Sequence, residues 1–159
     1  HKIIEKYYIK STIKNEKYIG NVTDEPYLKT IQKKFPFLSD SFSIFTLNTD
    51  MKIHVDTHRK ACINFIYPNG SKSYTKLYNV VTENPLIEYI PEYRINLYKE
   101  QDLLEVFKFE LNSTALFNTN IPHTVNLVNN IQRITLSWPI TQEYDFEYCK
   151  GKIKEYEKL

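Results

Sequence analysis

Short segments in which polar and apolar residues alternate follow one another from residue 41 to residue 138, and this pattern constrains the fold most. Alternation with a period of two is typical of half-buried β-strands, because successive side chains point to opposite faces of a sheet. The predicted strands are 41–47, 52–56, 61–67, 74–81, 87–90, 94–98, 106–111, 114–117, 124–127 and 133–138. Turn-forming residues separate several of them, as at 48–50 and 68–70. The sequence therefore predicts a mostly β protein of the sandwich or barrel type.

Helices are predicted only beside this β region. Residues 26–35 form the best candidate, because Asp24 lies at an N-cap position and Pro26 falls in the first turn. The chain from Glu143 onward is also expected to be helical. Residues 1–20 alternate loosely and are expected to give a strand or two.

The length of 159 residues predicts a single domain, 1–159, with its core at about 41–140. Hydrophobic residues make up 42% and charged residues 25% of the chain, which is typical of a globular protein. The 13 Tyr and 9 Phe favour sheet, since both fit a half-buried pleated surface.

Charge and hydropathy exclude several classes of partner. The 21 Lys and Arg exceed the 19 acidic residues by only two, so no nucleic acid is expected as a ligand. No membrane association is expected, because no apolar run approaches the ~18–20 residues of a membrane span. The first residues lack a signal-peptide pattern and the two cysteines make no disulfide framework, so a cytoplasmic location is predicted. We expect Cys62 to lie in the core and Cys149 at the surface.

His54 and Asp56 are two residues apart on a predicted strand, so both side chains point to the same face. Together they could hold a metal ion if a third ligand arrived from elsewhere, and His123 is the candidate. Two His and one carboxylate on one side of an ion leave coordination positions open, as in non-haem Fe(II) oxygenases. The alternative is that His54 is a surface residue and Asp56 a turn residue.

Arg133 and Thr135 share a face of the last predicted strand, ten residues beyond His123. A guanidinium suits a carboxylate bidentately, and a hydroxyl adds another donor. A polar stripe on a central strand needs an internal partner, such as a bound carboxylate. The alternative is an acidic partner of Arg133 on the exterior.

These residues resemble the Fe(II)/2-oxoglutarate-dependent dioxygenase superfamily, in particular small members near the prolyl and aspartyl/asparaginyl hydroxylases. The H-x-D…H triad of that family is similar to His54, Asp56 and His123, and its R-x-S/T element to Arg133 and Thr135. The resemblance implies that the triad holds Fe(II), and that Arg133 and Thr135 hold the distal carboxylate of the cosubstrate 2-oxoglutarate. It implies a hydroxylase acting on an amino-acid, peptidyl or small-metabolite substrate.

The resemblance also implies a double-stranded β-helix, a jelly roll of the cupin-like kind, with short flanking helices. The H-x-D pair would lie on the second core strand, the distal His on the seventh and the Arg on the eighth. A further residue of the family binds the cosubstrate near the metal. Asn64 is the best candidate, with Tyr74 and Tyr78 as alternatives.

Two other functions stay open at this point. One is a cupin-like metal- or sugar-binding module without oxygenase activity, and the other is a metal-free structural β-sandwich. Neither the substrate nor the oligomeric state follows from the sequence. His58 and Arg59 are expected in a solvated loop, the alternative being that Arg59 steers an acidic substrate or cosubstrate.

Overall fold

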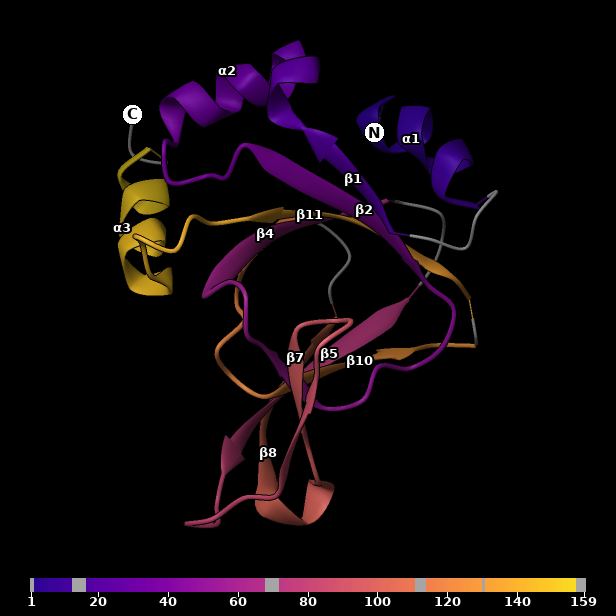
Figure 1. Cartoon of the computed structure of the whole chain (residues 1–159), viewed down its shortest axis with the longest axis vertical. Helices are drawn as coiled ribbons and strands as arrows, with labels where there is room; N and C mark the ends of the chain where they lie inside the picture. The colour runs from indigo at the N-terminus through magenta and orange to yellow at the C-terminus, as the bar shows by residue number, and fades with distance from the viewer. Residues whose placement is uncertain (1, 13–16, 68–71, 111–113, 130, 157–159) are drawn as a thin grey trace.

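The computed structural model describes residues 2–12, 17–67, 72–110, 114–129 and 131–156, which form two antiparallel sheets with helices beside them (Figure 1). The strands are β1 Tyr18–Asn21, β2 Ser41–Leu47, β3 His54–Asp56, β4 Ala61–Ile66, β5 Ser73–Val80, β6 Ile87–Ile90, β7 Ile95–Tyr98, β8 Leu103–Glu110, β9 Thr114–Asn118, β10 His123–Leu127 and β11 Arg133–Pro139. Each predicted strand is present, with ends that differ by at most three residues. The predicted turn at 68–70 and the end of the strand predicted at 106–111 lie outside the described residues.

The strand order identifies a double-stranded β-helix. One sheet has the order β1-β2-β11-β4-β9 and the other β6-β7-β3-β10-β5-β8. Eight strands form the jelly roll, namely β2, β3, β4, β5, β8, β9, β10 and β11. Counted along the chain, β3 is the second of these, β10 the seventh and β11 the eighth. The mostly β jelly-roll prediction is therefore confirmed, and the candidate site residues fall on the expected strands.

The helices pack on the five-stranded sheet (Figure 1). They are α1 Lys2–Thr12, α2 Pro26–Lys34 and α3 Phe146–Tyr156. Residues 1–20 were expected to give a strand or two, and β1 is one such strand, but residues 2–12 form helix α1 instead. Ile4 and Tyr7, three residues apart, are buried on one helical face, and the Tyr7 ring stacks on Tyr18 of β1. Tertiary packing therefore decides the structure of this short segment.

The two faces of the five-stranded sheet have different chemistry. Along β11, Ile134, Leu136 and Trp138 belong to the hydrophobic core under the helices. The alternate residues of the same strand are polar and equally buried, and they face the other sheet. The main apolar core thus lies between helices and sheet, and the β11 side chains that face the interior of the jelly roll are polar. Cys149 of α3 is fully buried in this core, so its predicted surface position is wrong.

Gly20 of β1 packs directly against the buried ring of Phe42, so a Cβ at this position would overlap the ring. Gly20→Ala is expected to lower the free energy of unfolding by about 1–3 kcal/mol, because the ring must move within a packed core. Gly151→Ala in α3 is the matched control. Its Cβ would meet no atom within 4 Å, and alanine is expected to stabilise the helix by about 0.5–1 kcal/mol. Urea unfolding measures both, and equal effects would contradict this account of the close approach.

Candidate functional site

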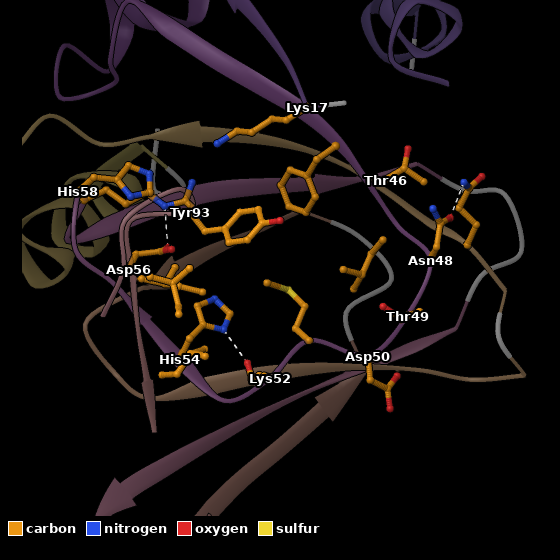
Figure 2. Close-up of a pocket in the computed structure, with 18 residues that line it drawn as sticks. Lys17, Thr46, Asn48, Thr49, Asp50, Lys52, His54, Asp56, His58 and Tyr93 are labelled. Atoms are coloured by element: carbon orange, nitrogen blue, oxygen red, sulfur yellow. Dashed lines mark hydrogen bonds and ion pairs between the residues drawn. The ribbon is translucent and has the colours of Figure 1, made fainter. Parts of the chain in front are cut away.

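A pocket of about 640 Å³ opens at the jelly-roll interior (Figure 2). Its lining includes His54 and Asp56 of β3 and the neighbouring Arg59. A smaller cavity of about 50 Å³ shares His54 and Arg59 with this pocket and reaches His123 and Arg133. Residues of the predicted metal and cosubstrate sites therefore line two adjoining hollows.

His54 and His123 lie directly opposite each other across β3 and β10, with their ring centroids 4.3 Å apart. Both side chains are buried, and each Nδ1 lies 2.8 Å from a backbone carbonyl oxygen, of Lys52 and Ile121 respectively. Burial, together with the neighbouring His54, lowers the pKa of His123 to about 3. With Nδ1 anchored to a carbonyl, Nε2 is the nitrogen left for another ligand, which is the usual arrangement of metal-binding histidines. A neutral imidazole is also the form that a metal requires.

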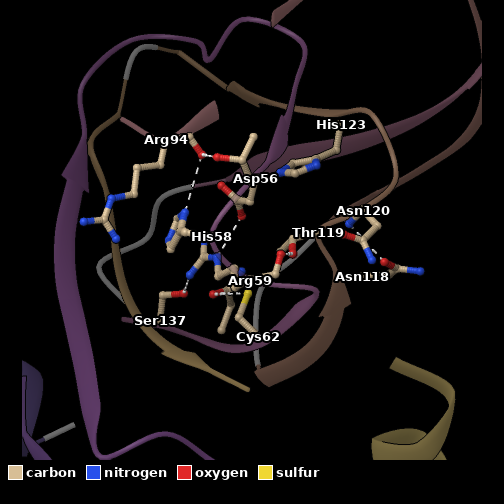
Figure 3. Close-up of polar contacts among 12 residues, drawn as sticks. Asp56, His58, Arg59, Cys62, Arg94, Asn118, Thr119, Asn120, His123 and Ser137 are labelled. Atoms are coloured by element: carbon tan, nitrogen blue, oxygen red, sulfur yellow. Dashed lines mark hydrogen bonds and ion pairs between the residues drawn. The ribbon is translucent and has the colours of Figure 1, made fainter. Parts of the chain in front are cut away.

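Asp56 lies two residues beyond His54, between the His123 ring and the Arg59 guanidinium (Figure 3). Arg59 donates from Nε to Oδ2 of Asp56 over 2.8 Å and from Nη1 to Oγ of Ser137 over 2.7 Å. Burial by itself would raise the pKa of Asp56, but Arg59 and the two imidazoles lower it. The expectation that Arg59 is solvated is wrong, because its side chain is only 13% exposed and holds this carboxylate.

The three predicted metal ligands are thus neighbours, yet their geometry is incomplete. In the part of the chain that the structure describes, no three His, Cys, Asp or Glu side chains are placed to hold a metal ion as they stand. The His123 imidazole suits a metal in protonation and both imidazoles suit it in orientation, whereas the Asp56 carboxylate is engaged by Arg59. A metal at this position would have to share Asp56 with that guanidinium.

Arg133 is buried at the inner cavity, and its hydrogen-bond partners within the described part of the chain are hydroxyl groups. Its Nε donates to Oγ1 of Thr135 and its Nη1 to Oγ of Ser73, each over 3.2 Å. Burial lowers the pKa of Arg133 to about 10, and among the described residues no acid forms an ion pair with it. The alternative of an acidic partner on the exterior is therefore wrong.

Thr75 adds a second unsatisfied group to this cavity. Its side chain is buried, and its Oγ1 has no hydrogen-bond partner among the residues that the structure describes. A buried cation without an acidic partner and a buried hydroxyl without a hydrogen-bond partner are both unfavourable unless a ligand satisfies them. The cavity is therefore suited to an anion.

Asn64 also lines the inner cavity, and its side-chain oxygen accepts a hydrogen bond from the Cys62 thiol over 3.3 Å. Tyr74 instead lies under the Lys108 ammonium, 4.2 Å from its ring centroid. Neither Tyr74 nor Tyr78 is part of the lining of the two hollows. Of the three residues considered for cosubstrate binding, Asn64 is the one that the fold brings to the cavity.

Two parts of the site were not predicted from the sequence. The first is the Asp56–Arg59 ion pair, which the i, i+3 spacing of a carboxylate and an arginine in the sequence could have indicated. Lys17 and Tyr93, which line the larger pocket, are the second. They come from the chain before β1 and from the β6–β7 turn, and no local pattern relates them to His54.

Comparison with known proteins adds little beyond the fold. No protein-family profile matches the chain, and no curated protein matches it. Among solved structures, vicilin from Capsicum annuum is 9% identical with a TM-score of 0.44, covering 80% of this chain and 28% of that one. A mutant of Bacillus subtilis oxalate decarboxylase OxdC is 9% identical with a TM-score of 0.42, over 80% and 26% of the two chains.

Vicilin from Corylus avellana gives 12% identity and a TM-score of 0.42, over 80% of this chain and 30% of that one. This chain thus spans less than a third of the structures that it matches. The fold rests on the strand order. Likenesses this low carry no argument about activity.

None of the described helices is long and apolar enough to cross a bilayer.

The buried His123 predicts a specific pH dependence of stability. Its pKa is about 3 in the fold against 6.5 ordinarily, so the unfolded chain takes up a proton between these values and the folded chain does not. Stability is therefore expected to fall as the pH decreases from about 6.5, by up to about 1.4 kcal/mol per pH unit. Urea unfolding with a chelator at pH 6.5 and pH 4.5 measures the loss. His123→Gln, which cannot titrate, should lose about 2 kcal/mol less over this interval, and an identical loss would contradict the assignment.

Proposed function

We propose that this protein binds a divalent metal ion and a small dicarboxylate in its jelly-roll interior, and acts as an Fe(II)- and 2-oxoglutarate-dependent dioxygenase. The observation that carries the proposal is Arg133, a buried guanidinium without an acidic partner among the described residues, in a cavity that His54 and His123 also line. A carboxylate on Arg133 would bring the rest of its molecule toward the two imidazoles. The resemblance of the sequence to this superfamily supports the same chemistry.

Each group of the site has a role in this proposal. His54 and His123 would ligate the metal as neutral imidazoles, held in position by the carbonyls on their Nδ1 atoms. Asp56 would supply the acidic ligand while Arg59 orients it. Arg133, with Thr135 beside it, would bind the far carboxylate of 2-oxoglutarate. When bound, Fe(II) supplies the reaction with dioxygen, and the buried interior excludes water from it.

A second function is favoured by the Asp56–Arg59 ion pair. If Arg59 keeps the carboxylate, the two imidazoles alone remain for a metal, and the protein is a cupin-like binding module without oxygenase activity. The ion pair is short, partly buried and supported by Ser137. This arrangement would weaken metal binding and would leave Arg133 to hold an anion of another kind.

Thermal unfolding under oxygen-free conditions separates the two functions. For the dioxygenase, 2-oxoglutarate should stabilise the protein only when Mn(II) or Fe(II) is present, by about 2.7 kcal/mol at one hundred times its Kd. Glutarate is the matched control, because it has both carboxylates but lacks the 2-oxo group that chelates the metal. Stabilisation by the metal with no further stabilisation by 2-oxoglutarate would favour the binding module, and no response to either would reject the dioxygenase. In air with Fe(II), succinate formation from 2-oxoglutarate tests the enzymatic step itself.

A further inference from the structure

The larger pocket is polarised along its length (Figure 2). The Lys17 side chain reaches toward the end where Asp56 and His58 lie, whereas Asn48 and Thr49 lie at the opposite end. The rest of the lining is largely apolar and includes Phe45, Leu47, Met51, Ile90, Ile95 and Leu97. A ligand that fills this pocket therefore meets a cationic end and an apolar wall.

The cationic end carries an excess of positive charge. Arg59 is paired with Asp56. Lys17, which lines the pocket, and Arg94, an exposed residue of the adjacent β6–β7 turn outside the lining, form no ion pair within the described ranges. Partial removal from solvent, together with the nearby Arg59 and Arg94, lowers the pKa of Lys17. These cations repel one another, and an anion placed among them would relieve the repulsion.

The fold holds Arg94 at this end by its backbone. Arg94 lies in the β6–β7 turn with φ of 53°, a left-handed conformation that is unusual for a residue other than glycine. Its carbonyl oxygen accepts hydrogen bonds from the backbone N–H and from Oγ1 of Thr57, over 2.9 and 2.8 Å. The turn is thereby tied to the segment that follows β3. Strained backbone of this kind persists only where its surroundings fix it, and it is concentrated at binding sites.

The pocket volume of about 640 Å³ lies within the range of small-molecule sites. We infer that the substrate is a small molecule with an apolar body and one anionic head group, a carboxylate or a phosphate, which lies beside Lys17 at the cationic end of the pocket, next to the turn that carries Arg94. This anion position is distinct from Arg133, which lines the inner cavity and not the larger pocket. That this ligand is a substrate rests on the proposed function. Binding of its anionic group does not require the metal.

A matched pair of fluorescent probes tests the inference on the metal-free protein. 8-Anilinonaphthalene-1-sulfonate carries an anionic head, whereas N-phenyl-1-naphthylamine has the same aromatic body without it. The sulfonate is expected to bind at least about tenfold more tightly, since hydrogen bonds to charged groups are worth that factor or more. The double substitution Lys17→Gln and Arg94→Gln should remove this advantage and change the affinity for the neutral probe less than about twofold. Phenylacetate and phenyl phosphate, as competitors, show which head group is preferred, with 2-phenylethanol as the neutral competitor.

Lys99→Gln is the control variant, because Lys99 is an exposed lysine that lines a different hollow. It should leave the affinity for both probes unchanged. Equal affinities for the two probes, an unchanged affinity in the double variant, or an equal loss in Lys99→Gln would each overturn the inference. Near-UV circular dichroism checks that the double variant is folded, and Lys17→Gln alone takes its place if it is not.

Arg133→Met separates this inference from the proposed function. Sulfonate binding should survive that substitution, whereas the metal-dependent response to 2-oxoglutarate should not. If the response to 2-oxoglutarate is absent from the wild-type protein while sulfonate binding depends on Lys17 and Arg94, the proposed function fails and the anion site stands.

Discussion

Replacing His123 by alanine is expected to weaken the binding of Mn(II) or Fe(II) by on the order of 100-fold or more. Loss of a group that merely orients a ligand already weakens a metal site by ~10–100-fold, so loss of a ligand should weaken it at least as much. His54→Ala and Asp56→Ala are expected to act in the same way and to abolish iron-dependent formation of succinate. Calorimetric titration of the metal under oxygen-free conditions, followed by succinate assays in air, measures both effects.

His58→Ala is the matched control for these variants. His58 is another histidine of the larger pocket, and its Nδ1 lies 3.5 Å from the carbonyl oxygen of Arg94. Its removal should leave the metal affinity unchanged. If His58→Ala weakens metal binding as much as His123→Ala, the metal lies elsewhere in the pocket, and retained turnover in His54→Ala would end the oxygenase assignment.

Arg133→Met is expected to have opposite effects on stability and on ligand binding. In the protein without ligand, the buried guanidinium has no acidic partner among the described residues, so an apolar side chain of similar length should raise the free energy of unfolding by about 1–3 kcal/mol. The affinity for 2-oxoglutarate should fall by on the order of 100-fold, because the charged partner of its carboxylate is removed. Urea unfolding and calorimetric titration with the metal present measure the two quantities.

Arg133→Lys provides the graded control, since it keeps the charge but loses the planar pair of donors. Its affinity for 2-oxoglutarate should lie between those of the wild type and Arg133→Met. A less stable Arg133→Met protein would contradict the prediction, because it would make the guanidinium a structural group of the interior. The expected result, in which Arg133 lowers stability but is needed for ligand binding, is a trade of stability for function that is common at binding sites.

Most of the fold could be predicted because the jelly-roll strands are half-buried, so their alternation is visible in the sequence. Helix α1 could not be predicted in this way. Its described buried positions are few, Ile4 and Tyr7, and they are covered only because β1 and β2 lie beneath them. Cys149 shows the same limit, since its burial depends on how α3 packs against the sheet.

The candidate site likewise has features that follow from strand periodicity and features that depend on tertiary structure. Residues i and i+2 of a strand lie on the same face of the sheet. The sequence could therefore predict that His54 and Asp56 point to one face, and that Arg133 and Thr135 do so too. The opposition of His54 to His123 depends on the register of β3 with β10, and the resemblance to a known family, not the local pattern, suggested it. The ion pair between Asp56 and Arg59 and the position of Lys17 at the pocket depend on the conformation of loops. A loop leaves no periodic pattern in the sequence from which its conformation could be predicted.

Among the described strands, the β6–β7 hairpin, Ile87–Tyr98, pairs with the rest of its sheet only through β3. It contributes Tyr93 to the pocket wall and places Arg94 nearby, whereas His54, Asp56, His123 and Arg133 all belong to the eight jelly-roll strands. Under the proposed function, the hairpin therefore carries part of the recognition of the substrate and none of the metal ligands. Under the proposed function, exchanging this hairpin for one of different length or charge would redirect selectivity while the reactive centre stayed intact, which makes it a natural target for directed evolution.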